Sequence, residues 1–168
     1  MCGIAGEFNF KGLVEPENIK RMTNAIIHRG PDDEGHYFEE HIGLGHRRLA
    51  ILDLTKTGHQ PMWTGDDSLA IVFNGEVYNF REIRIDLEEL GYRFKGESDT
   101  EVVINAIHFW GIEEALHRFI GMFAFALWDA RDQSLLLVRD RLGVKPLFYQ
   151  KTLKNLFHNN TLLTFPST

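Results

Sequence analysis

Cys2 is the first residue of the chain that could do chemistry, and it is the one cysteine among 168 residues. Most cysteines are small buried hydrophobic residues without a chemical role. Removal of Met1 would give Cys2 a free α-amine, whose ordinary pKa of about 7.7–8.0 lies close to working pH. A nucleophilic thiol and a suitable base would then share one residue, as in enzymes with an N-terminal threonine. Position 2 therefore makes Cys2 a candidate nucleophile, with a buried structural cysteine as the alternative.

Asn74 and Gly75 form a second pattern, directly after the apolar run 69–73. Asn-Gly after a strand is the strongest short signal of a β-hairpin turn, which is the structural interpretation. The functional interpretation is an oxyanion hole, because an Asn side-chain amide and a Gly backbone N–H can donate to the same oxygen. The dipeptide by itself does not choose between the two.

Three charged residues could bind charged groups of a substrate. Arg48 suits a carboxylate, because its guanidinium can bind both oxygens, but a basic residue beside a strand is also typical of a solvated edge. Asp99 begins a predicted helix, where a negative charge is favourable without any function, and it could equally bind an ammonium group. Glu76 has the same two interpretations.

Composition excludes several classes of protein. The formal charge of −6 argues against a nucleic-acid or membrane partner. The longest apolar run, 119–128, is too short to span a bilayer. The eight histidines form neither a His-Glu-x-x-His motif nor a cluster with cysteine, so we expect no metal site. With no signal peptide in view, we expect a cytoplasmic location.

Apolar periodicity predicts the elements that must position these residues. Helices are expected at 16–28, 80–90, 99–110 and 112–119, and strands at 4–10, 42–52, 69–73, 122–128 and 134–139. Asn79 with Glu82 and Ser98 with Glu101 resemble capping boxes, and 129–133 is typical of a hairpin connection. Several strands are joined directly, which predicts an α+β fold of antiparallel sheets with helices outside. Two facing sheets between helix layers would fit this pattern.

Seven short segments occur in a characteristic order. They are Met1-Cys2-Gly3-Ile4, His28-Arg29-Gly30-Pro31-Asp32, Arg48-Leu49-Ala50-Ile51, Asn74-Gly75-Glu76-Val77-Tyr78-Asn79, Ser98-Asp99-Thr100-Glu101, Gly121-Met122-Phe123-Ala124-Phe125 and Arg139-Asp140-Arg141-Leu142-Gly143. Together they resemble the glutamine amidotransferase domain of glutamine-hydrolysing asparagine synthetases, a class II amidotransferase with an N-terminal nucleophile. The segment 139–149 favours this type over the phosphoribosyl-pyrophosphate, glutamate-synthase and glucosamine-phosphate relatives.

The resemblance implies a four-layer αββα sandwich of the N-terminal-nucleophile hydrolase type and a role for each matching residue. Cys2 would be the nucleophile with its own α-amine as base, and Asn74 and Gly75 would form the oxyanion hole. Arg48 would hold the α-carboxylate of L-glutamine, and Glu76 and Asp99 its α-ammonium. The rest of the pocket would be lined by Leu49, Ala50, Ile51 and Leu52.

The implied activity is hydrolysis of L-glutamine to glutamate and ammonia through a γ-glutamyl thioester. The resemblance covers residues 1–150, which we expect to form the amidotransferase domain. The tail 151–168 departs from the family, which would continue into a synthetase domain with a Ser-Gly-Gly-x-Asp-Ser nucleotide loop, absent from this sequence. An excised piece, a truncation and a change of reading frame are the alternatives for this tail.

The implied destination of the ammonia is ATP-dependent asparagine synthesis from aspartate. We expect no cofactor in this chain, since ATP and Mg²⁺ would belong to the synthetase domain, the expected partner in cis. Two alternatives stay open. One is a catalytically silent binding or scaffold domain of the same fold, and the other is the glutaminase of a different amidotransferase.

Overall fold

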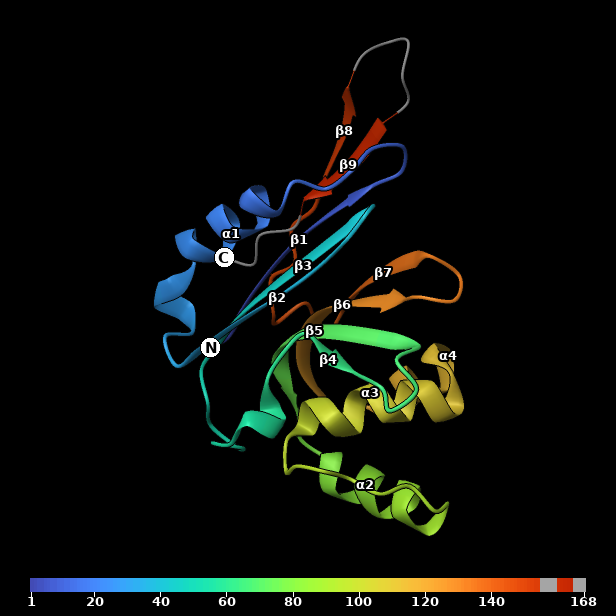
Figure 1. The fold of residues 1–168 in the computed structure, drawn as a ribbon. Coiled ribbons are helices and arrows are strands. Elements are labelled where there is room, and N and C mark those ends of the chain that lie inside the picture. The colour runs from blue at the N-terminus through green and yellow to red at the C-terminus, as the bar shows by residue number, and fades with distance from the viewer. Residues whose placement is uncertain (155–159, 165–168) are drawn as a thin grey trace.

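The strands of the protein form two antiparallel sheets (Figure 1). The computed structural model describes residues 1–154 and 160–164, of which 151–154 and 160–164 by the backbone alone. The first sheet has the order β2-β3-β1-β9-β8, with β1 (Gly3–Asn9), β2 (Asp33–Glu39), β3 (Ile42–Arg48), β8 (Gln150–Lys154) and β9 (Asn160–Thr164). The second has the order β4-β5-β6-β7, with β4 (Met62–Trp63), β5 (Leu69–Val77), β6 (Gly121–Asp129) and β7 (Ser134–Arg139). The predicted α+β class with antiparallel sheets is confirmed.

Helices flank the two sheets. Helix α1 (Pro16–Ala25) packs on β1 and β3, and helix α3 (Asp99–Trp110) packs on β5 (Figure 1). Helices α2 (Phe80–Glu89) and α4 (Ile112–Arg118) contact α3, and the short 3₁₀ helices are η1 (Ile27–Arg29) and η2 (Lys56–Gly58). No helix in the described part of the chain is both long and apolar enough to cross a membrane.

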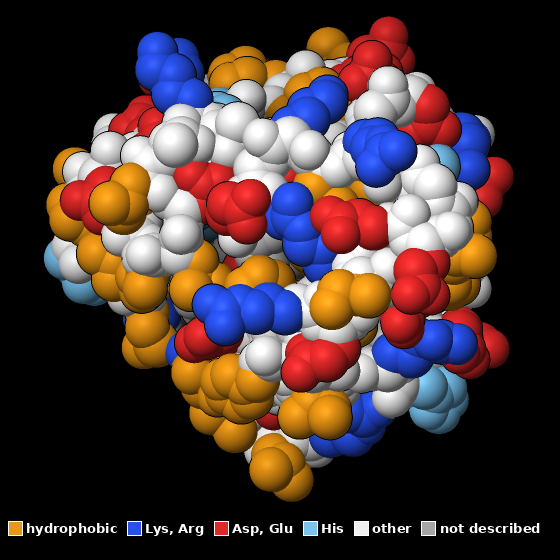
Figure 2. Space-filling model, turned by 90° about the horizontal axis from the view of Figure 1, so that it is seen from below, with side chains coloured by type: hydrophobic (Ala, Val, Ile, Leu, Met, Phe, Trp, Pro, Cys, Tyr) orange, Lys and Arg blue, Asp and Glu red, His pale blue; other side chains and the backbone are white. Residues whose placement is uncertain are grey.

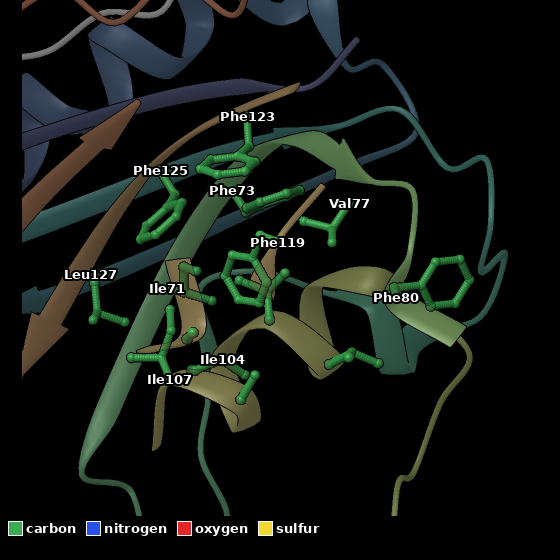
Figure 3. Packing of buried hydrophobic residues seen from close by; sticks show 14 of the residues in the cluster. Ile71, Phe73, Val77, Phe80, Ile104, Ile107, Phe119, Phe123, Phe125 and Leu127 are labelled. Atoms are coloured by element: carbon green, nitrogen blue, oxygen red, sulfur yellow. The ribbon is translucent and has the colours of Figure 1, made fainter. Parts of the chain in front are cut away.

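Strand β5 contributes to two separate hydrophobic cores, because successive side chains of a strand point to opposite faces. Ala70 and Val72 join a cluster with Ile4 of β1 and Trp128 of β6, between the sheets. Phe73 joins the other cluster, with the aromatic rings of β6 and the apolar side of α3 (Figure 3). Burial on both faces explains the continuous apolar run of this strand, and it holds the end of β5 rigidly in place.

Two sequence-based strand boundaries are wrong, and both errors lie at the proposed site. The strand expected at 42–52 ends at Arg48, and Ile51 is 70% exposed in the loop that follows. The strand expected to end before Asn74 continues to Val77. Asn74 and Gly75 pair with Ala124 and Phe123 of β6, so the interpretation as a hairpin turn is wrong. The ladder to β6 overrides the local preference of Asn-Gly for a turn.

The two predicted capping boxes differ in outcome. The Ser98 hydroxyl accepts from the Glu101 N–H at 3.3 Å, and α3 spans the predicted 99–110. The Asn79 side chain makes no cap, because it donates to the Arg118 carbonyl and accepts from the Ile120 N–H, both at 2.9 Å. The Asn79 side chain is thus occupied by the backbone at and after the end of α4, and it is not available to cap α2. The helix expected at 16–28 divides into α1 and η1, while strands β2, β4, β8 and β9 were not predicted.

Charged side chains of both signs intermingle with hydrophobic ones on the face shown in Figure 2. Among the ion pairs of α2 and α4, Arg84 Nε lies 3.0 Å from Glu88 Oε1, and Arg118 Nε lies 2.7 Å from Glu114 Oε1. Such solvent-exposed pairs contribute little to stability. The face shown therefore differs from the continuous basic surface that is typical of nucleic-acid-binding proteins.

Candidate active site

A cavity of about 140 Å³ brings together most of the residues that the sequence singled out. From that set, the lining includes Cys2, Arg48, Leu49, Ile51, Leu52, Asn74, Gly75, Glu76 and Asp99. Ala50 is not among the described lining residues, and its N–H donates to Asp32 Oδ2 at 2.9 Å. Several other residues line the same space although no site role was predicted for them, namely Met1, Asp53, Gly58, Gln60, Phe73, Ser98, Thr100, Met122 and Lys145.

Cys2 is placed by the edge of β1 and the loop after β3. Its Sγ accepts from the Leu49 N–H at 3.4 Å and donates to the Leu49 carbonyl at 3.8 Å. The Cys2 carbonyl accepts from Arg29 Nε at 3.1 Å. Burial raises the pKa of the Cys2 thiol, and the Leu49 hydrogen bond offsets part of that shift. A thiol with a raised pKa needs a base before it can act as a nucleophile.

Asn74 holds an unused hydrogen-bond donor inside this cavity. The residue is 1% exposed, and its Nδ2 has no partner among the residues that the structure describes. A buried donor without a partner costs free energy, which makes it a feature of functional sites. Gly75 beside it has no space for a side chain, since a Cβ would lie 2.6 Å from the Phe123 Cα. Because β6 approaches so closely, the residue after Asn74 must be glycine.

Arg48 is the last residue of β3, and its guanidinium turns toward the loop that follows. Nη1 donates to the Thr55 carbonyl at 2.7 Å, and Nη2 donates to the Asp53 carbonyl. A side chain at Gly58 would collide with the guanidinium, so this residue leaves room for it. Since a guanidinium has five N–H donors, these bonds orient Arg48 and leave further donors for a ligand.

Asp99 and Glu76 supply negative charge on another wall. Asp99 is the first residue of α3, and its Oδ2 accepts from the Val77 N–H at 3.2 Å. Burial raises the pKa of Asp99 to about 6, and the neighbouring Glu76 charge contributes to the same shift. Two carboxylates on the same wall attract a cation between them.

The Asp53 carboxylate joins the loop after β3 to the start of α3. It accepts from the Thr55 N–H and the Thr57 hydroxyl at 2.7 Å and from the Glu97 N–H at 3.1 Å. Burial by itself raises the pKa of Asp53, but these hydrogen bonds outweigh it and leave the pKa well below its ordinary value. The Asp-x-Thr-x-Thr spacing is a sequence signal for the local bonds to Thr55 and Thr57, since Asp side chains commonly bond the backbone two residues on, but it does not indicate the bond to Glu97.

The arrangement offers a thiol, a free amide donor, a guanidinium and two carboxylates around one small space. The guanidinium and the carboxylates can bind the carboxylate and the ammonium of an amino acid. The ligand's own side-chain polar group would then lie near the thiol. Within the described residues, no group of three or more His, Cys, Asp or Glu side chains could hold a metal ion.

Comparison with known proteins gives consistent matches. Glutamine-hydrolysing asparagine synthetase 1 of Bacillus subtilis is 44% identical over 153 residues, which is 89% of this chain and 24% of that protein. A putative asparagine synthetase of Methanocaldococcus jannaschii is 42% identical over 89% of this chain and 32% of its own length. Amidase chyE of Penicillium rubens is 41% identical over 79% of this chain and 20% of its length.

This chain spans about a quarter of the length of the curated relatives that it matches. The family model described as a glutamine amidotransferase domain matches residues 1–165, which is nearly the whole chain. The chain therefore belongs to the glutamine amidotransferase domain family.

Proposed function

We propose that this domain hydrolyses L-glutamine to glutamate and ammonia, with Cys2 as the nucleophile. The observation that supports this most directly is the buried Asn74 Nδ2, which has no partner among the described residues and lies in the cavity that also contains the Cys2 thiol. A donor held free beside a nucleophile is what stabilisation of an oxyanion requires.

Substrate binding would use the charges on the cavity walls. Arg48 would bind the α-carboxylate of glutamine, because its guanidinium is already oriented by the Asp53 and Thr55 carbonyls. Glu76 and Asp99 would bind the α-ammonium group. This cation would also favour the ionised form of Asp99, whose burial otherwise favours the neutral acid. The side-chain amide of glutamine would then extend toward Cys2.

The chemistry would begin with transfer of the thiol proton to the Cys2 α-amine. The thiolate attacks the amide carbon, a C–S bond forms, and the carbonyl π electrons move onto oxygen. Asn74 Nδ2 and the Gly75 N–H would donate to this oxyanion. The ammonium form of the α-amine returns its proton to the leaving nitrogen, the C–N bond breaks and ammonia departs. Water, activated by the same amine, hydrolyses the γ-glutamyl thioester to glutamate.

Met1 must be absent for this mechanism. While Met1 is attached, the nitrogen of Cys2 is an amide without a basic lone pair. Met1 also lines the cavity, so it takes up space that the substrate would need. The active form of the protein would therefore begin at Cys2.

The fold of this domain would be the four-layer αββα sandwich of N-terminal-nucleophile hydrolases. Helix α1 on the first sheet, a hydrophobic cluster between the sheets and helix α3 on the second sheet support this assignment. The domain would comprise residues 1–150. The tail 151–168 lies only partly within the described residues, since 155–159 and 165–168 are outside them.

A synthetase domain in cis would be the partner that consumes the ammonia, with ATP and Mg²⁺ bound there and asparagine made from aspartate. The asparagine synthetases among the relatives support this acceptor, and a cytoplasmic location would suit it. The similarity to an amidase favours a second candidate, a glutaminase that serves a different acceptor. Asparagine formation by this chain alone would contradict the proposal that the acceptor site lies in another domain.

Glutamate release tests the proposed function. Intact-mass analysis separates protein that begins at Cys2 from protein that retains Met1, and each fraction is incubated with L-glutamine. We expect turnover from the processed fraction and none from the other. Equal turnover by both fractions would contradict the α-amine as the base. No glutamate from the processed fraction would contradict the glutaminase and favour a silent binding domain.

A further inference from the structure

The segment 139–145 is held by several side-chain hydrogen bonds, and the proposed mechanism does not use it. The Asp140 carboxylate accepts from the backbone N–H groups of Leu142, Val144 and Lys145, at 3.1, 2.9 and 2.9 Å, and from that of Phe123 on β6 at 3.2 Å. Burial alone would raise the pKa of Asp140, but these bonds hold it below its ordinary value. The carboxylate therefore fixes the loop to the second sheet.

Arg139 closes the same loop from the other side. Its Nε donates to the Lys145 carbonyl at 2.7 Å, and its Nη2 donates to the Gly143 carbonyl at 2.5 Å. Gly143 has φ of +64°, which other residues rarely adopt. Both the N–H and the C=O of Lys145 are thus held by charged side chains, which fixes the direction in which this lysine leaves the backbone.

Lys145 is directed inward, whereas the preceding residue, Val144, faces solvent. Lys145 is 5% exposed and lines the cavity with Cys2, while Val144 is 55% exposed. Its Nζ lies 2.8 Å from the Met1 Sδ, which is the one partner of this ammonium among the described residues. A thioether is a weak acceptor, and burying an ammonium without a strong partner is costly. This position therefore calls for a functional explanation.

We propose that Lys145 is a positioning residue that acts through Cys2: once Met1 is removed, its ammonium lies beside the new N-terminus and favours the neutral, basic form of the Cys2 α-amine. The inference rests on the proposed function. Five covalent bonds separate the Met1 Sδ from the Cys2 nitrogen, so the ammonium lies within about 9 Å of that nitrogen. At such a distance and partial burial, one charge shifts a neighbouring pKa by about one unit.

Charges of both signs surround Cys2. Arg48, Asp53, Glu76 and Asp99 line the cavity with Lys145, and Arg29 bonds the Cys2 carbonyl. Bound glutamine would pair its carboxylate with Arg48 and its ammonium with the Glu76 and Asp99 pair, so it would leave the net charge of the site unchanged. A neutral residue in place of Lys145 therefore removes one positive charge from an otherwise unaltered set. Loss of that charge favours the ammonium ion over the neutral amine.

The decisive measurement is the pH dependence of kcat at saturating glutamine, since kcat reports groups in the substrate complex. The proteins compared all begin at Cys2 by intact mass. In Lys145→Met the acid limb of kcat should move to higher pH by about one unit, while Lys145→Arg should keep the wild-type profile. Lys11→Met, at an exposed position outside the cavity, is the matched control. Lys145→Gln gives a second neutral variant if Lys145→Met does not fold.

A structural role alone would lower kcat equally at every pH or lower the melting temperature. An acid limb of the neutral variants that coincides with that of wild type, with normal melting, would overturn the inference and leave the proposed function intact. Wild-type protein that releases no glutamate would instead overturn the proposed function itself. Direct titration of the Cys2 amine by NMR, without substrate, gives a second readout, and its pKa should be higher in Lys145→Met.

Discussion

The Asp53 carboxylate accepts a hydrogen bond from the Glu97 N–H at 3.1 Å, joining two segments that lie 44 residues apart in the sequence. One segment is the loop whose carbonyls orient Arg48, and the other leads into α3 and Asp99. This bond therefore helps to fix the spacing between the proposed carboxylate site and the proposed ammonium site. An α-amino acid has a fixed separation of these groups, so the spacing should decide how well it binds.

Asp53→Asn should raise the KM for glutamine with a smaller change in kcat, because Asp53 acts on substrate binding through Arg48. Loss of the buried acceptor should also cost about 1–3 kcal/mol of stability. Asp66→Asn is the matched control, because that carboxylate also accepts hydroxyl bonds, from Thr64 and Ser68 at 2.7 Å, but does not line the cavity. Similar KM changes in both variants would contradict the specific role of Asp53.

The stabilising effect of Asp53 should depend on pH in a defined direction. Its pKa in the folded protein lies well below the ordinary value. Its contribution is therefore fully present above the unfolded pKa of about 3.9 and is lost as pH falls below it. The difference in unfolding free energy between wild type and Asp53→Asn should be constant near neutral pH and shrink in acid. Denaturant titrations at a series of pH values measure it.

Cys2→Ala should abolish glutamine hydrolysis and leave the fold intact. No second cysteine exists to replace the thiol, and removal of one small side chain at a partly exposed position should cost little stability. Glutamate release and thermal melting are measured on the same preparation. Residual turnover near the wild-type value, with a normal melt, would contradict the assignment of Cys2 as the nucleophile.

Asn74→Ala should lower kcat more than it raises KM. Its Nδ2 has no partner among the described residues without substrate, so its bond would form as negative charge develops on the substrate oxygen. Loss of one such donor raises the barrier by about 2.7–4 kcal/mol. The steady-state constants of the variant give the split, and an effect confined to KM would exclude the oxyanion role.

Arg48→Ala should act mainly through KM, because the proposed bond to the α-carboxylate exists in the ground state as well as in the transition state. Arg48→Lys keeps the charge but not the paired N–H groups, so it should bind glutamine with an intermediate KM. Melting curves are needed alongside, since Arg48 also bonds two loop carbonyls. A KM unchanged in both variants would contradict the carboxylate site.

The KM for glutamine should rise as pH falls below about 6. Burial raises the pKa of Asp99 to about 6, so acid converts it to the neutral form that no longer attracts the ammonium group. Asp99→Asn should have a high KM at every pH and lose most of this dependence, with the remainder due to Glu76. Initial rates over a pH series measure the effect, and an unaltered pH dependence in the variant would argue against Asp99 as its origin.

The sequence predicted which residues meet better than it predicted how the backbone brings them together. Arg48, Asn74 and Asp99 lie on β3, β5 and α3, yet they line one cavity with Cys2. The mid-strand position of Asn74 was not predictable from local pattern, because pairing with β6 overrides the turn propensity of Asn-Gly.

Residues that act through long-range hydrogen bonds were harder to find. Asp53 gains its role from the Glu97 N–H and Lys145 from the position of Met1, and neither contact has a local signature. The segment 139–143 has no local pattern that predicts its conformation, which depends on the hydrogen bonds that the Asp140 carboxylate accepts from the loop. Such tertiary contacts depend on the assembled sheets, which a pattern of one sequence does not specify.

Asn74 and Gly75 lie within a continuous β ladder rather than in a loop. Their orientation is therefore settled when the protein folds, before any substrate arrives, so little reorganisation energy should accompany formation of the tetrahedral intermediate. Any change of conformation on ligand binding would occur instead in the segment after Arg48. Backbone amides of β5 should exchange slowly with deuterium whether or not glutamine is bound, whereas protection of the segment 49–57 should grow on binding.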